Sequence, residues 1–498
     1  MSRKKESNQD DYVKKESKKS VKDKRSIVFR IICAVYIILT VLFFGYIISI
    51  NMLPTTYLVI LAAVILIITG GLSFGIVKKQ NKMVINIICS VIACIILAIY
   101  GGAYYYLDHT FKFIDTMSNV SEQVEEYYVI ANSNSNLKAI TDIKKENLYM
   151  FATQEDISDV KNDLKTKSEV TFKEEDNLDT LSTKLLKGKI DLILLSSSQY
   201  SMIVDEKENF VKDTKIIYTA VHKIKTVIEP ETNKEEKSNQ KIEDGVFNVY
   251  ISGIDTSGSI NNVSRSDANI IATINTKTHE VLLTSIPRDY YVTLHSKQAK
   301  DKLTHSGIYG INETLSTIED LLEIDINYYV RVNFTTLIKV VDAIGGIDVN
   351  SDMAFSTVGY NFTSGNNHLN GNKALAFSRE RHAFADGDRQ RGKNQQKVIA
   401  AIIDKLTSST TILTKYSNIL SSLSSSFQTN IAQKDISALV KGQLDNMTSW
   451  TITNVSLDGA GSKATTYSAG SQKLYVMIPD QATVNDAKTK INTLLNNK

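Results

Sequence analysis

Cysteine, proline and tryptophan are scarce in this chain of 498 residues. There are three cysteines, four prolines and one tryptophan. The cysteines (Cys33, Cys89 and Cys94) all lie in apolar stretches near the N-terminus, so no disulfide framework supports residues 108–498. This fits a bacterial envelope protein better than a secreted eukaryotic one. The low proline content, together with 23 glycines, excludes a collagen-like or low-complexity chain.

Formal charge is absent from residues 31–77 and from residues 83–107. A bilayer crossing needs about 20 apolar residues, so the first stretch is long enough for two crossings and the second for one. Pro54 lies in a plausible turn between the first two. The sequence therefore predicts three transmembrane helices, at residues 27–50, 55–77 and 83–107.

Basic residues flank these apolar stretches on one side. Residues 1–30 carry 11 Lys and Arg against 5 Asp and Glu, and the loop after the second span holds Lys78, Lys79 and Lys82. Because cytoplasmic loops favour Lys and Arg, we predict a multi-pass membrane protein with a cytoplasmic N-terminus and everything after residue 108 outside. We expect residues 1–25 to be disordered and the basic tail (1–26) to act as a topogenic signal. The alternative is that it binds a cytoplasmic signalling partner.

The part of the chain beyond the spans is mildly acidic. Residues 108–498 hold 43 basic and 49 acidic residues, although the whole chain has a net charge of +3. A nucleic-acid partner is therefore not expected. A charged segment without apolar periodicity, residues 229–244, predicts a linker between an accessory domain (108–228) and a larger domain (245–498).

Both external domains mix the helical and the strand periods, which predicts an α/β or α+β fold with a central mixed sheet covered by helices. In the accessory domain we expect a helix at 181–187 and strands at 191–196 and 215–221. In the larger domain the predicted strands are 247–252, 269–275, 281–286, 328–334 and 347–349, and the predicted helices are 308–323, 335–344 and 389–406.

The hairpin formed by strands 269–275 and 281–286 gathers charged residues. Antiparallel pairing brings its outer ends together, so Arg265 and Asp267 should meet Arg288 and Asp289 at one sheet edge. Asp255 joins them if strand 247–252 runs parallel to 281–286. Such an edge is a common place for a binding site, but it is also consistent with a solvated rim of salt bridges.

A second concentration of charge lies at residues 378–396. Asp388, Arg391 and Gln395 share one face if this segment is helical, and Arg379 and Arg381 precede them. An acid, an arginine and an amide at a helix start suit anion capture, whereas the alternative is an ordinary amphipathic helix.

Together the two clusters are typical of a site for phosphate groups with a bound Mg²⁺. Asp255 and Asp267 supply one or two carboxylates to Mg²⁺, the usual protein share when phosphates provide the other ligands. We expect phosphate oxygens to be bound bidentately by four arginines, namely Arg288, Arg379, Arg381 and Arg391. No set of His and Cys has zinc spacing, and His305 and His382 are interpreted as site-lining or satisfied polar residues rather than as metal ligands.

These motifs resemble the LytR-CpsA-Psr family of envelope phosphotransferases. They occur in the family's order: GID (253–255), RSD (265–267), SIPRD (285–289), KLTH (302–305), VDAIGG (341–346), SRERH (378–382), DRQRGKNQQ (388–396) and MIPD (477–480). The three-helix anchor and the accessory domain further resemble the streptococcal capsule-associated branch. One departure is that Asp255 is followed by Thr256, where many members carry an arginine soon after this aspartate.

The resemblance implies a phosphotransferase that moves a glycopolymer, here a capsular polysaccharide, from a polyprenyl-pyrophosphate carrier onto peptidoglycan with Mg²⁺. The metal ligands it implies are Asp255 and Asp267. The expected pyrophosphate-binding residues are Arg265, Arg288, Lys302, Arg379, Arg381, Arg391 and Gln395. The expected catalytic residues are Arg288, Asp289, Asp388 and Arg391, with Asp388 as the candidate base and Asp289 as its alternative.

Two other functions remain open at this point. The chain could be a membrane-bound regulator of envelope synthesis that binds the lipid-linked polymer without transferring it. It could also be a scaffold that only organises the polymer machinery. The scaffold predicts that removing the charges of Arg379 and Arg381 leaves polymer attachment intact. The regulator is tested by deleting residues 1–25, because lost regulation with intact attachment would indicate two functions.

Overall fold

A computed structural model describes residues 2–77, 83–118, 122–152, 155–207, 209–225, 242, 245–254, 260–357, 359–407, 415, 419 and 427–497. The chain divides into two compact units, residues 1–113 with 433–446 and residues 114–432 with 447–498. The first unit holds the apolar helices, and the second holds the sheets.

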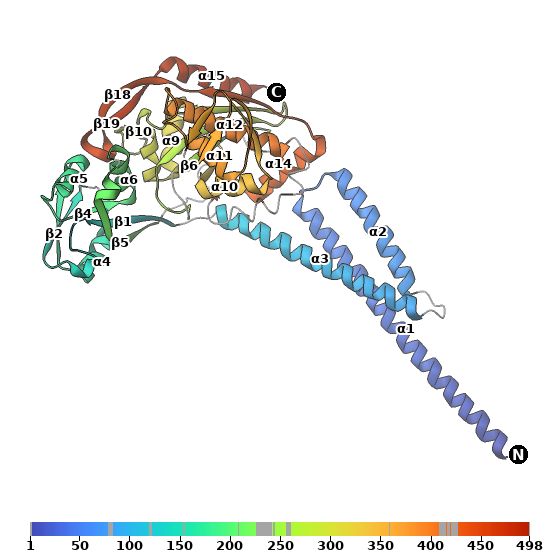
Figure 1. Cartoon of the computed structure of the whole chain (residues 1–498). Helices are drawn as coiled ribbons and strands as arrows, with labels where there is room; N and C mark the ends of the chain where they lie inside the picture. Colours follow the sequence, from blue (N-terminus) through green and yellow to red (C-terminus); the bar gives the residue numbers. More distant parts are fainter. Residues whose placement is uncertain are drawn as a thin grey trace. The chain divides into compact units, whose positions relative to one another are not determined.

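Long helices make up the first unit (Figure 1). They are α1 (Ser2–Ile50), α2 (Thr55–Val77), α3 (Met83–Ser118) and α14 (Gln433–Asn446). Three segments are long and apolar enough to cross a membrane, namely Arg25–Ile50, Thr55–Val77 and Met83–Asp108. The three predicted spans are therefore confirmed as helices of suitable length and composition. Buried Tyr36 and Ile76 pack between them, and the rings of Phe43 and Tyr100 stack with centroids 4.3 Å apart.

The basic tail is helical, so the expectation of disorder was wrong. Residues 2–25 contain neither proline nor glycine, and Lys and Glu are good helix formers. The apolar span that follows already supplies the helical nucleus, so each added residue gains a backbone hydrogen bond. The turn after α1 lies where Pro54 predicts it. Asn51 has a φ of 51°, and Leu58 N donates to Pro54 O over 3.0 Å at the start of α2.

The accessory domain is built on a five-stranded mixed sheet in the order β3-β2-β4-β1-β5. Its strands are β1 (Glu122–Asn132), β2 (Glu146–Phe151), β3 (Val170–Glu175), β4 (Leu192–Ser196) and β5 (Thr214–Lys225). Its helices are α4 (Ser158–Lys167), α5 (Leu178–Leu186), α6 (Ser197–Glu206) and α7 (Phe210–Asp213). The strands and the helix predicted here are present, with ends that differ by a few residues.

Alternate residues of β1 face two separate apolar cores. Val129 packs with Leu164 of α4 on one side of the sheet, and Ile130 packs with Leu181 of α5 on the other. All five residues of β4 are buried, because this central strand is covered on both faces. The second core also includes Leu474, so the accessory domain packs directly on the larger one.

The larger domain is built on a six-stranded mixed sheet in the order β16-β11-β6-β7-β8-β17. Its strands are β6 (Val246–Ile254), β7 (Ser266–Asn275), β8 (Glu280–Ile286), β11 (Tyr328–Asn333), β16 (Phe427–Thr429) and β17 (Thr451–Ser456). β7 is antiparallel to both β6 and β8, so β6 and β8 run in the same direction, which is the condition under which the sequence places Asp255 at the charged edge. The expected mixed α/β fold is therefore present.

Helices cover both faces of this sheet (Figure 1). On one face α9 (Ile311–Leu322) and α15 (Gln481–Asn496) pack on Tyr250 and Ile271. The other face is contacted by α12 (Asp388–Thr407), which lies against β8 and β17. α10 (Phe334–Ala343) and α11 (Gly371–Arg379) share an apolar core with α12.

Short elements complete the larger domain. They are β9 (Tyr291–Thr293), β10 (Lys300–Lys302), α8 (Leu303–Ser306), β12 (Ile347–Ser351), β13 (Phe355–Thr357), β14 (Tyr360–Phe362), β15 (Gly365–Leu369), β18 (Gly459–Thr466) and β19 (Gly470–Pro479). α9 begins three residues later than predicted, because Gly310 has a φ of 100° and separates it from a 3₁₀ turn at Gly307–Tyr309. The predicted linker, residues 229–244, lies outside the described residues apart from residue 242.

Candidate active site

The β7–β8 hairpin brings the first charged cluster together. Asn269 pairs with Ile286, so Asp267 and Arg288 lie just beyond the last paired residues of the two strands. Arg288 Nη1 donates to Asp267 Oδ2 over 3.1 Å. The prediction that the outer ends meet is confirmed for this pair. Asp255, which follows β6, lies outside the described residues.

Asp267 is a buried carboxylate whose side chain is 13% exposed. Thr304 Oγ1 donates to its Oδ1 over 2.9 Å. Burial alone raises the pKa of Asp267, but the positive charges of Arg288, Arg265 and Arg391 outweigh it and hold this pKa well below its usual range. Asp267 is therefore ionised at neutral pH.

Arg288 carries a buried donor that has no partner. Its Nε is buried and donates no hydrogen bond among the described residues, and it lies 4.0 Å from Asp289 Oδ1. Burial disfavours the charged form of Arg288, but nearby carboxylates, Asp267 first, raise its pKa above the usual value. Buried donors are nearly always paired, so this N–H marks a position that suits an acceptor such as a phosphate oxygen.

Asp289 and Lys302 form a second buried ion pair beside the first. Lys302 Nζ lies 3.1 Å from Asp289 Oδ1, and both side chains are about one-tenth exposed. Leu303 N donates to Tyr290 O over 2.8 Å, which joins the two segments through their backbones. Burial raises the pKa of Asp289, but Lys302 and then Arg288 lower it overall.

The first turn of α12 contributes Asp388 and Arg391 to the same cluster. Arg391 Nη2 lies 3.2 Å from Asp388 Oδ1. Burial raises the pKa of Asp388, and the neighbouring Asp289 raises it further, while Arg391 only partly offsets this. The two neighbouring carboxyls therefore have opposite pKa shifts, and Asp388 is the one that accepts a proton more readily.

Side-chain amide bonds hold α12 against the edge of the sheet. Gln396 Nε2 donates to Leu283 O over 2.8 Å and to Val455 O over 2.7 Å. Gly392 lets the helix approach closely, since a Cβ there would lie 3.1 Å from Ser285 Oγ. The start of α12 is thereby fixed near the end of β8, where Arg288 follows.

The remaining predicted residues show other contacts. The guanidinium of Arg379, at the end of α11, lies 4.0 Å from the ring centre of Phe334, and Arg381 Nε donates to His382 Nε2 over 3.3 Å. Gln395 is half-buried on α12. Their roles in pyrophosphate binding therefore stay predictions.

His305 is a satisfied buried residue, as interpreted from the sequence. Its Nδ1 lies 2.6 Å from Asp301 Oδ1 and 2.7 Å from Ser468 Oγ. Because both partners share one ring nitrogen, this is not the relay of a Ser-His-Asp triad. The group links α8 to the segment before β19.

Sequence reasoning missed two residues of the accessory domain. Asp205 Oδ2 accepts hydrogen bonds from Arg265 Nη1 at 2.6 Å and from Arg288 Nη2 at 3.1 Å. Ser201 Oγ accepts one from Arg265 Nη2 at 2.9 Å. No sequence motif marks this helix, and only the packing of the two domains brings it to the arginines.

The carboxylate oxygens of Asp267 are suitable ligands for a hard divalent cation. Among the described residues, no group of three or more His, Cys, Asp or Glu side chains is arranged to hold a metal ion. Mg²⁺, however, needs only one or two protein carboxylates when phosphates complete its shell. Asp267 is ionised, and each of its oxygens keeps a lone pair beyond the single hydrogen bond it accepts. The chemistry of Asp267 therefore fits Mg²⁺.

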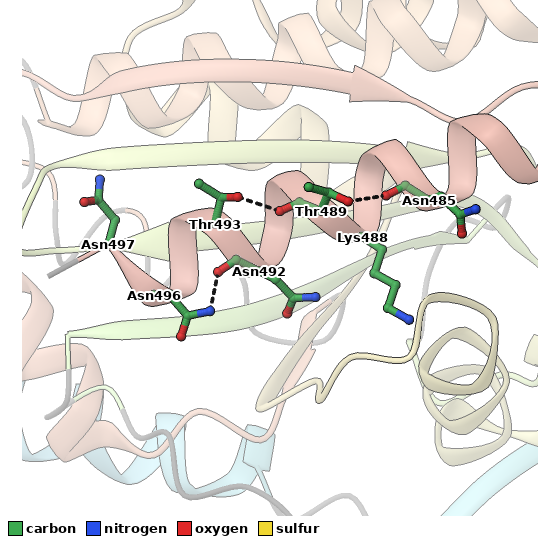
Figure 2. A pocket seen from close by; sticks show the side chains of 7 residues that line it. All are labelled: Asn485, Lys488, Thr489, Asn492, Thr493, Asn496 and Asn497. Atoms are coloured by element: carbon green, nitrogen blue, oxygen red, sulfur yellow. Dashed lines mark hydrogen bonds between the residues drawn. The ribbon is translucent and has the colours of Figure 1, made fainter.

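A surface hollow lies elsewhere, along α15 (Figure 2). It has a volume of about 890 Å³ and is lined by Asn485, Lys488, Thr489, Asn492, Thr493, Asn496 and Asn497. Several of these side chains donate back to the backbone of their own helix, as Thr493 does to Thr489 O. The described residues that line the hollow include no carboxylate, and none of them belongs to the ionic cluster around Arg288, so the hollow is not the candidate active site.

A family model described as the LytR_cpsA_psr family matches residues 214–491, more than half of the chain. The chain belongs to this family. The match covers the larger domain and the last strand of the accessory sheet, and it begins after α6. The resemblance noted in the motifs is thereby confirmed.

Named relatives act on wall polymers. One is the polyisoprenyl-teichoic acid–peptidoglycan teichoic acid transferase TagU of Bacillus cereus, 32% identical over 257 residues, which are 50% of this chain and 82% of the relative. Among solved structures, TagU of B. subtilis is 32% identical and aligns with 51% of this chain and 98% of its own, with a TM-score of 0.40. Protein gbs0355 of Streptococcus agalactiae is 27% identical, with 53% and 92% covered and a TM-score of 0.45.

Proposed function

We propose that this chain is a membrane-anchored phosphotransferase that moves a glycopolymer from a polyprenyl-pyrophosphate carrier onto peptidoglycan. The observation that carries the proposal is the buried ionic cluster in which Arg288 contacts Asp267 and its Nε–H has no partner among the described residues. The names of the relatives, which are teichoic acid transferases, supply the reaction class.

The reaction is a displacement at phosphorus. A sugar hydroxyl of peptidoglycan attacks the phosphorus that bears the polymer and forms a new P–O bond. The bond from that phosphorus to the bridging oxygen breaks, and polyprenyl phosphate leaves with the bridging oxygen. The acceptor proton passes to a carboxylate, and the polymer becomes joined to peptidoglycan through a phosphodiester.

The arginines bind and orient the donor in this scheme. Arg288 and Arg391 provide fixed positive charge next to the reacting phosphates, and such preorganised charge stabilises a phosphoryl-transfer transition state. Mg²⁺ held by Asp267, and by Asp255 as the family resemblance implies, would neutralise part of the pyrophosphate charge. Arg265, Lys302, Arg379, Arg381 and Gln395 are further proposed contacts to the pyrophosphate.

Asp388 is our choice for the group that accepts the proton of the acceptor hydroxyl. Its raised pKa makes it a stronger base than Asp289, whose pKa is lowered and whose carboxylate is paired with Lys302. Its side chain is also more exposed, 28% against 11%, which leaves room for an acceptor.

The cargo we propose is a capsular polysaccharide, because the three-helix anchor and the accessory domain resemble the capsule-associated branch. We also propose that the N-terminus is cytoplasmic and that the site is extracytoplasmic, since the basic flanks lie at residues 1–30 and 78–82. A donor carrying a capsular repeat and one carrying a teichoic acid unit, compared in the same assay, test the cargo.

The experiment that tests the proposal is a transfer assay with the full chain in lipid nanodiscs. A defined polyprenyl-pyrophosphate saccharide is the donor, and peptidoglycan is the acceptor. We expect transfer that a chelator abolishes and that added Mg²⁺ restores. Asp267→Asn should remove the response to Mg²⁺. Tight donor binding without any transfer would instead favour the membrane-bound regulator.

A further inference from the structure

The last turn of α6 in the accessory domain reaches two arginines of the larger domain. Ser201 and Asp205 lie four positions apart and therefore share one face of this helix. Arg265 donates from Nη2 to Ser201 Oγ and from Nη1 to Asp205 Oδ2. Arg288 donates from Nη2 to the same Asp205 oxygen.

A single carboxylate oxygen thus bridges two buried guanidiniums. The side chain of Arg265 is 5% exposed and that of Arg288 is 8% exposed, whereas that of Asp205 is 35% exposed. Burial alone raises the pKa of Asp205, but Arg265 and Arg288 lower it below the usual value, so the carboxylate is ionised. An anion bridging two arginines is the arrangement that a phosphate oxygen adopts with such a pair.

The Asp205 carboxylate accepts hydrogen bonds from N–H groups of Arg265 and Arg288 that a phosphate ligand would also need. Both terminal nitrogens of Arg265 are engaged by α6, and one terminal nitrogen of Arg288 is engaged by Asp205. An anionic ligand can reach this pair fully only if the Asp205 carboxylate leaves it. Because that side chain is one-third exposed, a rotation into solvent is enough, and the domains need not separate.

This contact is not part of the region that the family shares. The family match begins at residue 214, whereas α6 ends at Glu206. The family match therefore does not include the residues of α6 that contact the two arginines, so the contact is a feature of this chain's accessory domain. The affinity of a variant that lacks the Asp205 charge distinguishes a competing carboxylate from a positioning group.

We propose that Asp205 is a built-in competitor of the anionic ligand, through which the accessory domain controls access to Arg265 and Arg288. The inference rests on the proposed function, in which these arginines bind the donor pyrophosphate. Ligand binding and the Asp205 contact are then mutually exclusive. Any event that moves α6 away from the arginines increases the affinity of the site for phosphate.

The test measures binding of inorganic pyrophosphate, with Mg²⁺, to the full chain in nanodiscs by calorimetry. Asp205→Asn keeps the shape of the side chain and removes its charge, and we expect about tenfold tighter binding than in the unmodified chain, a change of about 1.4 kcal/mol. Glu206→Gln is the matched control on the next, exposed residue and should leave the affinity unchanged. Ser201→Ala frees one Arg265 donor but retains the Asp205 charge, so its affinity should rise by less than that of Asp205→Asn.

The possible results separate the two proposals. If Arg288→Ala binds pyrophosphate as well as the unmodified chain, the proposed function has the wrong site. If Arg288→Ala loses binding while Asp205→Asn binds no tighter, the site stands and the competitor is refuted. Weaker binding by both Asp205→Asn and Ser201→Ala would show that α6 positions the arginines. Thermal melting of each variant identifies any that is misfolded, and Asp205→Ser then replaces Asp205→Asn.

Discussion

The accessory domain and the larger domain contribute to one ionic cluster in very different ways. The larger domain supplies its charges from strand ends and a helix start, where Asp267, Arg288 and Asp388 occur in recognisable motifs. The accessory domain supplies Asp205 from the end of a helix that carries no motif. The comparison teaches that local sequence identifies residues brought together by one sheet, but not a residue brought in by the packing of a second domain.

Removing Arg288 from the larger domain should lower the transfer activity more than any other change considered. Arg288→Ala deletes a buried charge beside the reacting phosphates, and we expect transfer to fall by about 10³-fold, the upper range for losing one preorganised donor. Initial rates of polymer attachment measure this. Arg389→Ala is the control, because Arg389 lies on the same helix as Arg391 but is half exposed and pairs with Asp458. Equal rates for the two variants would contradict the role of Arg288.

Removing the carboxylate of Asp388 should lower the transfer rate less than removing Arg288, and it should also change the pH dependence of the rate. Because its pKa is raised, the acidic limb of kcat/KM should lie above the ordinary Asp value of about 3.9, with activity lost as the pH falls through it. Asp388→Asn should lower the rate by about 10²-fold and abolish that limb. A limb that persists in Asp388→Asn and disappears in Asp289→Asn would assign the base to Asp289.

Weakening the attachment of α12 should lower activity less. Gln396→Ala removes the donor to the buried carbonyl of Leu283 and the partly buried carbonyl of Val455, and should cost about 1–3 kcal/mol of unfolding free energy. Because the charges of α12 remain, we expect a rate only about tenfold lower, from misplacement of Asp388 and Arg391. Denaturant melts and kinetics on one preparation check both. A stable variant as slow as Arg288→Ala would show that Gln396 itself contacts the substrate.

The distant core of the accessory domain should matter least to the chemistry. Leu164 is fully buried in α4, on the side of the sheet opposite the core that includes α5 and α6. Leu164→Ala should lower the unfolding free energy of this domain by about 3 kcal/mol and change the rate by less than about twofold. Thermal melting and transfer rates measure the two effects. A large loss of rate at a temperature where the variant is folded would give this domain a direct role in the chemistry.

The limits of the sequence prediction have physical causes. The hairpin, the Arg288–Asp267 contact and α12 were predictable, because strand alternation and helical spacing are local properties. The start of α9 was not, since a left-handed Gly310 overrides the apolar period. The helix in the tail was not predicted, because a highly charged composition indicates disorder, whereas the absence of proline and glycine in residues 2–25 permits a helix. Asp205 lies 60 residues from Arg265 and 83 from Arg288, and no local pattern reports a contact between two domains.

The most direct test of the account is the identity of the lipid product. The donor's pyrophosphate is cleaved between its two phosphorus atoms if the cluster around Arg288 catalyses the proposed displacement. Mass spectrometry of the full chain acting on a defined donor and peptidoglycan should then find one polyprenyl monophosphate released for each phosphodiester-linked saccharide attached. Release of intact polyprenyl pyrophosphate, or attachment of saccharide without its phosphate, would contradict the account.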